Sequence, residues 1–286
     1  MAYQDPAALR RRLQRELRRL RTEKGETQRD VAAHMDWSPS KLIRIEAGAV
    51  GVSTNDLRQL LAHYGVADDA VEELVAINKE GRNKSWPEYP VLSPQARVYY
   101  GLESSAAILR QFEPTIVPGL LQTEEYTRAL LKGANWPGLG DDKINQLVEA
   151  RAARQLLLDR DPSPEMFFML DEAVIRREVG GKSVMRRQLD RIEDVASRDR
   201  VTVQVIPFVR GAHPGITGPF VLLEFTDEDT ALYLESHSEI VTRDDPDAIG
   251  DYLDLFQTME RDLATSPDEV GKVFSRVKKE LHWENA

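Results

Sequence analysis

The fold of the first part of this chain is decided by residues 27–48, which read TQRDVAAHMDWSPSKLIRIEAG. Thr27 can cap a helix with its hydroxyl, and Asp30, three residues later, can return the bond as in a capping box. Apolar residues follow at helical spacing. The pattern predicts a short helix over residues 27–35.

A second helix is predicted over Ser38–Ala47, after a tight connection. Ser38 can satisfy an otherwise orphan backbone amide, and Pro39, at the first helical position, has no amide to satisfy. Gly48 is well placed to end the helix.

The second helix has two distinct faces. Leu42 and Ile45 are three residues apart and are expected to face a core, whereas Ser40, Lys41 and Arg44 fall together on the opposite, exposed side. An exposed face with hydroxyl and basic groups suits contact with the edges of base pairs.

The flanking sequence predicts three more helices, over residues 6–22, from about residue 53 to 64, and over 68–78. Two short helices joined by a tight turn, inside a package of five, form a helix-turn-helix. We therefore expect an all-α DNA-binding domain over residues 1–84.

The DNA contacts are expected at the start of the first helix of the pair and along its second helix. Arg44 is the better candidate for guanine O6 and N7, whereas Gln28 can sit over a phosphate or brace the second helix. Ser38 is primarily an N-cap. The predicted DNA-binding residues are Thr27, Gln28, Arg29, Ser38, Ser40, Lys41 and Arg44.

The charge distribution agrees with this assignment. The whole chain has a net charge of −10, but residues 1–64 carry twelve Lys and Arg against eight Asp and Glu, a net of +4. The remainder has 26 against 40, a net of −14. The arginines of the first helix are expected to bind the phosphate backbone, together with Gln28 and Lys41.

Composition excludes several classes of protein. The chain has 286 residues and no cysteine, so disulfides and thiolate metal sites cannot form. It has no apolar run of about 18 residues and no basic-then-apolar start typical of a secretory signal. The expectation is a cytoplasmic protein that does not enter a membrane.

Residues 85–286 are expected to form an α+β effector and dimerisation domain, mainly helical with a small sheet. Strands are predicted at 167–170, 201–206, 220–225 and 231–235. Helices are predicted at 95–111, 123–131, 141–160, 183–196, 247–263 and 267–281.

Residues 27–48 resemble the helix-turn-helix of XRE/Cro/C1-type bacterial and phage repressors. Further phrases resemble the DUF5753 domain, Scr1-type and antitoxin-like, of the WhiJ kind, found in actinobacterial XRE regulators. They are YGLE at 100–103, VPGLLQTEEY at 117–126, RAARQ at 151–155, DEAVIRR at 171–177 and GPF at 218–220. The resemblance implies a transcriptional regulator with a small DUF397-type protein as partner. Residues 278–286 match no pattern of that family.

No catalytic motif is present, so an enzyme, a cofactor and a metal are not expected. The run at 181–183 is not a phosphate loop, because Arg176 stands where a glycine is needed. His213 lies in a glycine-rich loop, where an exposed histidine is the simpler reading. Partner or ligand candidates, for which a scaffold role is the simpler reading, are Pro118, Gly119, Leu120, Leu121 and His213.

The chain is therefore interpreted as a homodimeric, sequence-specific transcriptional regulator that binds double-stranded DNA. Its C-terminal domain would bind the partner protein, mediate dimerisation, or do both. Three alternatives stay open: a repressor that responds to a small molecule without a protein partner, an antitoxin, and an enzyme tethered to DNA.

Overall fold

The computed structural model describes residues 6–46, 50–82, 89–133, 139–226, 230–235, 240–243 and 245–283. By compactness the chain divides into two units. One consists of residues 1–88 and 96–105, and the other of residues 89–95 and 106–286. The expected boundary between residues 84 and 85 lies close to the first change of unit.

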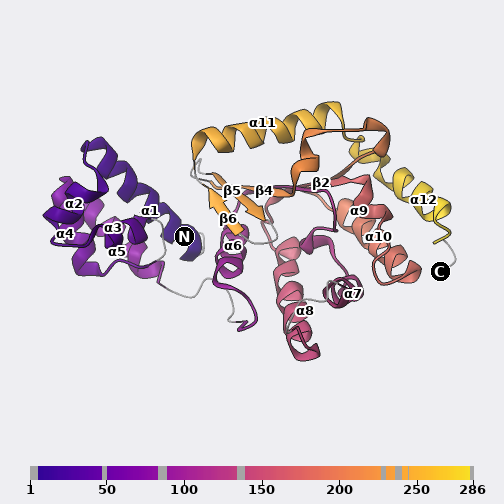
Figure 1. The fold of residues 1–286 in the computed structure, drawn as a ribbon, viewed down its shortest axis with the longest axis horizontal. Helices are drawn as coiled ribbons and strands as arrows, with labels where there is room; N and C mark the ends of the chain where they lie inside the picture. Colours follow the sequence, from indigo (N-terminus) through magenta and orange to yellow (C-terminus); the bar gives the residue numbers. More distant parts are fainter. Residues whose placement is uncertain are drawn as a thin grey trace. The chain divides into compact units, whose positions relative to one another are not determined.

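The first unit contains the five expected helices (Figure 1). They are α1 (Pro6–Glu23), α2 (Gln28–His34), α3 (Pro39–Glu46), α4 (Thr54–Tyr64) and α5 (Asp68–Glu80). Most of α6 (Pro94–Ser105) also groups with this unit. The predicted end of α3 at Gly48 lies outside the described residues.

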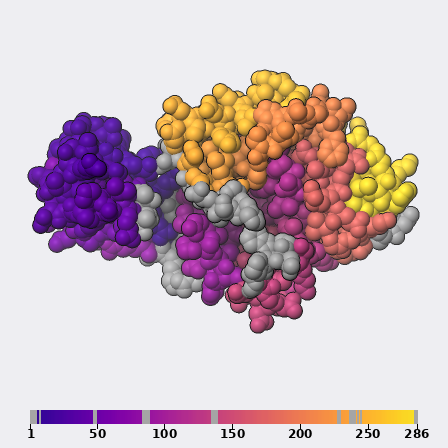
Figure 2. Space-filling view, viewed as in Figure 1, coloured from indigo at the N-terminus to yellow at the C-terminus, as the bar shows by residue number. Residues whose placement is uncertain are grey.

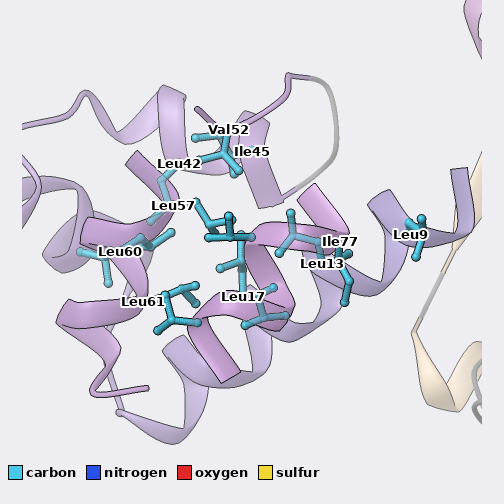
Figure 3. Close-up of a cluster of buried hydrophobic side chains, with 14 of the residues drawn as sticks. Leu9, Leu13, Leu17, Leu42, Ile45, Val52, Leu57, Leu60, Leu61 and Ile77 are labelled. Atoms are coloured by element: carbon cyan, nitrogen blue, oxygen red, sulfur yellow. The ribbon is translucent and has the colours of Figure 1, made fainter. Parts of the chain in front are cut away.

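One apolar core joins these helices (Figure 3). Leu9, Leu13 and Leu17 of α1 form a leucine stripe at helical spacing and are at most 5% exposed. The same cluster includes Leu42 of α3 and Leu57 of α4, both fully buried. Burying a leucine side chain contributes about 1.5–3 kcal/mol, so this core fixes α3 to the rest of the unit.

The second unit is built on a six-stranded sheet with the strand order β3-β2-β1-β4-β5-β6. Its strands are β1 (Ile108–Glu113), β2 (Glu165–Asp171), β3 (Val201–Ile206), β4 (Phe220–Glu224), β5 (Thr230–Glu235) and β6 (Ile240–Arg243). β1, β2 and β3 run parallel, and the remaining neighbours pair antiparallel. The sheet is thus larger than the four predicted strands.

The prediction of a helix over 95–111 is wrong after residue 105, because α6 ends at Ser105 and residues 108–113 form β1. Leu, Arg and Gln favour helices, but here the residues alternate between the two faces of the sheet. Leu109 and Phe112 are both fully buried, on opposite faces. β6 was not predicted at all.

The helices of the second unit agree with the predictions except at some ends and for the short α9, which is not among the predicted helices. They are α7 (Glu124–Gly133), α8 (Asp141–Gln155), α9 (Glu172–Arg176), α10 (Lys182–Ala196), α11 (Pro246–Asp262) and α12 (Val270–Glu280). The long helix predicted to Arg160 becomes a 3₁₀ turn, η2, over Leu156–Asp159. A 3₁₀ turn, η5 (Pro267–Glu269), precedes α12.

The sheet is covered on both faces. α11 lies along one face (Figure 1), where Phe256 and Met259 pack on Phe112 and Phe220 of the two central strands. The atoms of α11 form one side of this unit's surface in Figure 2. α8 and α10 lie on the other side of the sheet. None of the described helices is both long and apolar enough to cross a membrane.

Candidate nucleic-acid interface

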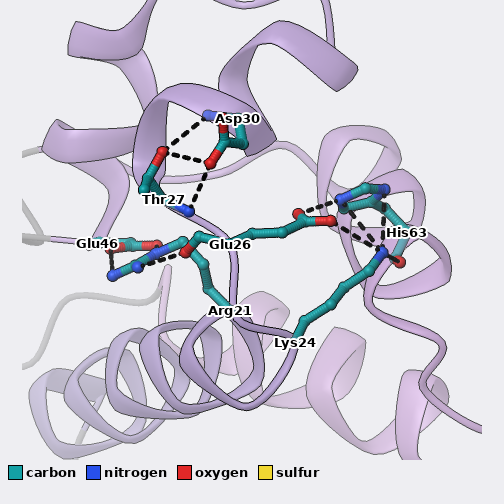
Figure 4. A network of polar contacts seen from close by, with 7 residues as sticks. All are labelled: Arg21, Lys24, Glu26, Thr27, Asp30, Glu46 and His63. Atoms are coloured by element: carbon teal, nitrogen blue, oxygen red, sulfur yellow. Dashed lines mark hydrogen bonds and ion pairs between the residues drawn. The ribbon is translucent and has the colours of Figure 1, made fainter.

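The helix pair α2–α3 begins with the predicted capping box (Figure 4). The backbone amide of Asp30 donates to Thr27 Oγ1 at 3.2 Å, and the backbone amide of Thr27 donates to Asp30 Oδ2 at 3.0 Å. The Thr27 hydroxyl also donates to Asp30, and these bonds lower the pKa of the Asp30 carboxyl. The sequence signal here is confirmed in full.

The turn between the two helices is closed by its own backbone. The amide of Trp37 donates to Ala32 O at 2.8 Å, and Asp36 adopts a positive φ of 54°. Aspartate tolerates this conformation better than most residues. The turn therefore fixes the angle at which α3 leaves α2.

α3 presents the two faces that the sequence predicted. Leu42 and Ile45 are buried, whereas Ser38, Ser40 and Arg44 are exposed. Thr27 and Arg29 are also exposed, at the start of α2. Seven residues earlier predicted to contact DNA thus lie on α2, α3 or directly before them, and five of them offer exposed side chains.

Buried Glu46 anchors the back of α3 (Figure 4). Its carboxylate, 1% exposed, accepts from Arg21 Nε at 2.8 Å and Arg21 Nη2 at 3.1 Å. Gln28 Nε2 donates to it at 2.8 Å, so Gln28 does brace the second helix. The hydrogen bond with Glu46 raises the pKa of Arg21. The partners of Glu46 could not be identified from the sequence.

Lys41 is held at the edge of the exposed face. Its Nζ lies 3.0 Å from Asp56 Oδ2 of α4 and 3.9 Å from the centre of the Trp37 ring. Its side chain is 39% exposed. A phosphate contact by Lys41 would have to share or replace this ion pair.

Several arginines of α1 are neutralised within the unit. Arg12 pairs with Glu73, Arg19 with Glu16 and Glu23, and Arg21 with Glu46. The expectation that α1 supplies the phosphate contacts is therefore not supported at these three positions. Within the part of the chain that the structure describes, neither Arg29 nor Arg44 takes part in an ion pair.

A second polar cluster, missed by sequence reasoning, joins α4 to the α1–α2 turn (Figure 4). His63 Nε2 lies 2.7 Å from Glu26 Oε2, and the His63 hydrogen bond lowers the pKa of Glu26. Lys24 donates to the His63 carbonyl and lies 3.5 Å from Glu26. His63 is distant in sequence from its partners, so no local pattern could reveal the cluster.

The candidate loop of the second unit is part of its core. Pro118, Leu120 and Leu121 are buried, and Gly119 is half-buried, in the 3₁₀ turn η1 (Gly119–Leu121). A Cβ at Gly119 would stand 2.6 Å from the guanidinium of Arg154. Exposure therefore gives no support to a docking role for these four residues.

Three glutamine side chains form hydrogen bonds with the backbone of this loop. Gln122 Nε2 donates to Val117 O at 2.6 Å, and Gln155 Nε2 donates to Gly119 O at 2.9 Å. Gln188 of α10 donates to Leu121 O and accepts from the Thr123 amide, both at 2.7 Å. The loop is a hydrogen-bonded scaffold element.

His213 is buried, so the expectation of an exposed loop histidine is wrong. Its side chain is 2% exposed, with Nε2 3.0 Å from Asp171 Oδ2. Asp171 also caps α9 by accepting from the Ala173 amide at 2.7 Å. The His213 ring stands edge-on to Phe112 at 5.9 Å. The histidine therefore ties the β3–β4 connection to the end of β2.

A half-open cavity of about 440 Å³ lies at the carboxyl ends of β2 and β3. Its lining includes Glu172, Pro207, Val209, Lys272 and Arg276. Volumes of this size can hold a small molecule. Across the described residues, no group of three or more His, Asp and Glu side chains is arranged to hold a metal ion.

Taken together, the capped α2, the fixed turn and an α3 with one buried and one exposed polar face define a helix-turn-helix protein. A helix-turn-helix domain family matches residues 12–74. A second family, described as a domain of unknown function (DUF5753), matches residues 96–275, and the chain belongs to this family. No curated protein and no solved structure matched the chain.

The family matches confirm both resemblances, to the helix-turn-helix regulators and to DUF5753. They support DNA-binding regulation as the general function of the chain.

Proposed function

We propose that this protein is a sequence-specific transcriptional regulator, not an enzyme, that inserts α3 into the major groove of operator DNA. The observation that carries the proposal is the build of α3. Buried Glu46 and Leu42 hold one face against the unit, while Ser40 and Arg44 project from the other. A recognition helix has this arrangement, because its exposed residues contact base edges.

Arg44 is the proposed base reader, and Arg29 and Lys41 are the proposed phosphate contacts. Arg44 is exposed, and its guanidinium can donate two parallel hydrogen bonds to guanine O6 and N7. Arg29 projects from the start of α2, where helix-turn-helix proteins meet the backbone. Gln28, already bound to Glu46, keeps one amide hydrogen for a phosphate.

The proposal is tested by fluorescence anisotropy of the full chain on its own upstream promoter DNA and on scrambled DNA, across a salt series. We expect tighter binding to the promoter and a steep loss of affinity with salt, since counterions are released from the phosphates. Equal, weak binding to both duplexes would count against the proposal. The proposal would be refuted if selection from a random library also yielded no preferred site.

Replacing Arg44 by Ala should lower affinity for the specific site by about 1–3 kcal/mol and relax the base preference at one position. Arg12→Ala is the matched control, because Arg12 lies on α1 and is paired with Glu73 of α5. Equal losses on specific and scrambled DNA would instead make Arg44 a phosphate contact.

We propose further that the second unit mediates homodimerisation, binds a small DUF397-type partner, or does both. Two recognition helices about 34 Å apart would then read a pseudo-palindromic operator. Membership of the DUF5753 family supports a regulatory role for this unit. Light scattering of the chain alone and mixed with a small DUF397-type protein tests both parts. A chain that is monomeric and does not bind the small protein would refute them.

The cavity at the ends of β2 and β3 favours a second candidate, a regulator that responds to a small molecule. Lys272 and Arg276 line it together with the carboxylates of Glu172 and Glu269, which would favour a ligand that carries both a carboxylate and a cationic group. Thermal-shift screening of small carboxylates, with Arg276→Ala as the comparison variant, tests it. Shifts that are identical in both proteins would place any binding elsewhere.

A further inference from the structure

Ile43 is exposed in the middle of α3, although the unit has a well-filled core. Its side chain is 46% exposed, whereas Leu42 is fully buried and Ile45 is 3% exposed. The core is thus complete without Ile43. A β-branched residue also gives a helix no advantage over alanine. Neither stability nor helix propensity accounts for isoleucine at this position.

The position of Ile43 is the notable feature. It follows Ser40 by three residues and directly precedes Arg44, so Ser40, Ile43 and Arg44 share the exposed face of α3. The apolar side chain therefore belongs to the same surface as the polar groups proposed to contact bases. Lys41 lies at the edge of this face, held by Asp56.

The major groove offers an aliphatic side chain one apolar partner, the C5-methyl group of thymine. We infer that Ile43 contacts a thymine methyl group and makes the operator require a T·A pair next to the base pair that Arg44 reads. This inference rests on the proposed function, since it needs α3 in the major groove. It adds a hydrophobic specificity contact to a surface that is otherwise polar.

The test uses the full chain and an operator selected from a random duplex library. Each thymine of the selected site is replaced, one at a time, by deoxyuridine, which lacks only the methyl group. Binding is measured for the wild type, Ile43→Ala and Val98→Ala. Val98 is the matched control, because it is another aliphatic residue with 44% exposure, on α6.

One deoxyuridine position should weaken binding of the wild type and of Val98→Ala by about fourfold, as expected for losing one buried methyl group. The same substitution should have no effect on Ile43→Ala, whose affinity for the thymine site is already reduced. Alanine favours helices, so this variant should keep α3 folded.

Binding by α3 and the contact by Ile43 give different results when they are absent. If the library yields no preferred site, the proposed function fails. If a preferred site exists but every deoxyuridine substitution affects the wild type and Ile43→Ala equally, the proposed function stands and the Ile43 contact is overturned.

Discussion

Glu46 of the first unit is buried and Glu113 of the second unit is half-buried, and the two carboxylates are compensated differently. Glu46 in the first unit receives three hydrogen bonds, two of them from the Arg21 guanidinium. Glu113, at the end of β1, receives one from the amide of Gln111 at 2.9 Å. The pKa of Glu113 is raised to about 8: burial is the largest cause, the hydrogen bond from Gln111 opposes it, and the charge of Glu235 raises the pKa while that of Arg154 lowers it.

The difference shows what a partner's charge does to a buried acid. A guanidinium with two parallel bonds stabilises the ionised form and makes Glu46 a fixed anchor for α3. An amide cannot offset the loss of hydration, so Glu113 favours its neutral form. One glutamate therefore holds the proposed recognition helix in place, and the other makes its unit sensitive to pH.

The largest expected effect comes from removing Glu46, whose buried carboxylate is paired with Arg21. Glu46→Ala should lower the free energy of unfolding of the first unit by about 3 kcal/mol, because it leaves the Arg21 guanidinium without its buried partner. Glu72→Ala is the control, since it removes an exposed pair with Arg58 worth at most about 1 kcal/mol. Urea denaturation read by hydrogen-exchange mass spectrometry follows each unit separately. Equal losses in both variants would show that burial adds nothing to the pair.

Glu113 should give the second unit a pH-dependent stability. A carboxyl group whose pKa is raised from 4.5 to about 8 binds a proton in the folded state that the unfolded state has lost. Its stabilising contribution is therefore complete below pH 4.5 and declines as pH rises towards 8, with a limiting slope of about 1.4 kcal/mol per pH unit.

We expect the second unit to lose about 1–3 kcal/mol between pH 6 and pH 8 through this group, and Glu113→Gln to remove that loss. Glu165→Gln, at the partly exposed start of β2, is the control that should keep the wild-type profile. The same hydrogen-exchange measurement is made at both pH values. Identical pH profiles for the wild type and Glu113→Gln would contradict the assignment.

The smallest expected effect comes from removing the amide of Gln28, which donates one hydrogen bond to Glu46. Gln28→Ala should destabilise the first unit by about 1 kcal/mol, because the carboxylate keeps both bonds from Arg21. Gln59→Ala, on the exposed face of α4, should cost less. If Gln28→Ala leaves stability unchanged but weakens DNA binding, Gln28 serves the phosphate backbone and not Glu46.

The helix-turn-helix could be predicted from the sequence because its signals are local. The Thr27–Asp30 capping box, the Ser38-Pro39 start and the apolar spacing of Leu42 and Ile45 all lie within 27–48. The partners of Glu46 could not be predicted, since Arg21 is 25 residues away and only packing decides which carboxylate it meets. Because this partner is distant in sequence, Arg21 is wrongly included among the arginines expected to contact phosphate.

The second unit was harder to predict because its contacts are distant. β1 carries Arg110, whose partner Glu224 is 114 residues away, and both faces of the strand are covered. Buried residues such as Leu109 and Phe112 therefore occur on both faces of the strand. The sequence shows no simple apolar–polar alternation that would distinguish it from a helix. For the loop at 117–123 the sequence favours a scaffold role but leaves a partner or ligand site open, because Gln188, which binds the loop, lies 65 residues further along the chain.

The central position of β1 also has a consequence for the order of folding. Its two neighbours, β2 and β4, come much later in the chain, so the sheet cannot close around β1 until residues 220–224 have been synthesised. The first unit, by contrast, forms its core from helices that are close in sequence and needs no such long loops. Contacts of low sequence separation form fast, and parallel strands with long crossovers form slowly. The helix-turn-helix is thus complete while the sheet is still being made.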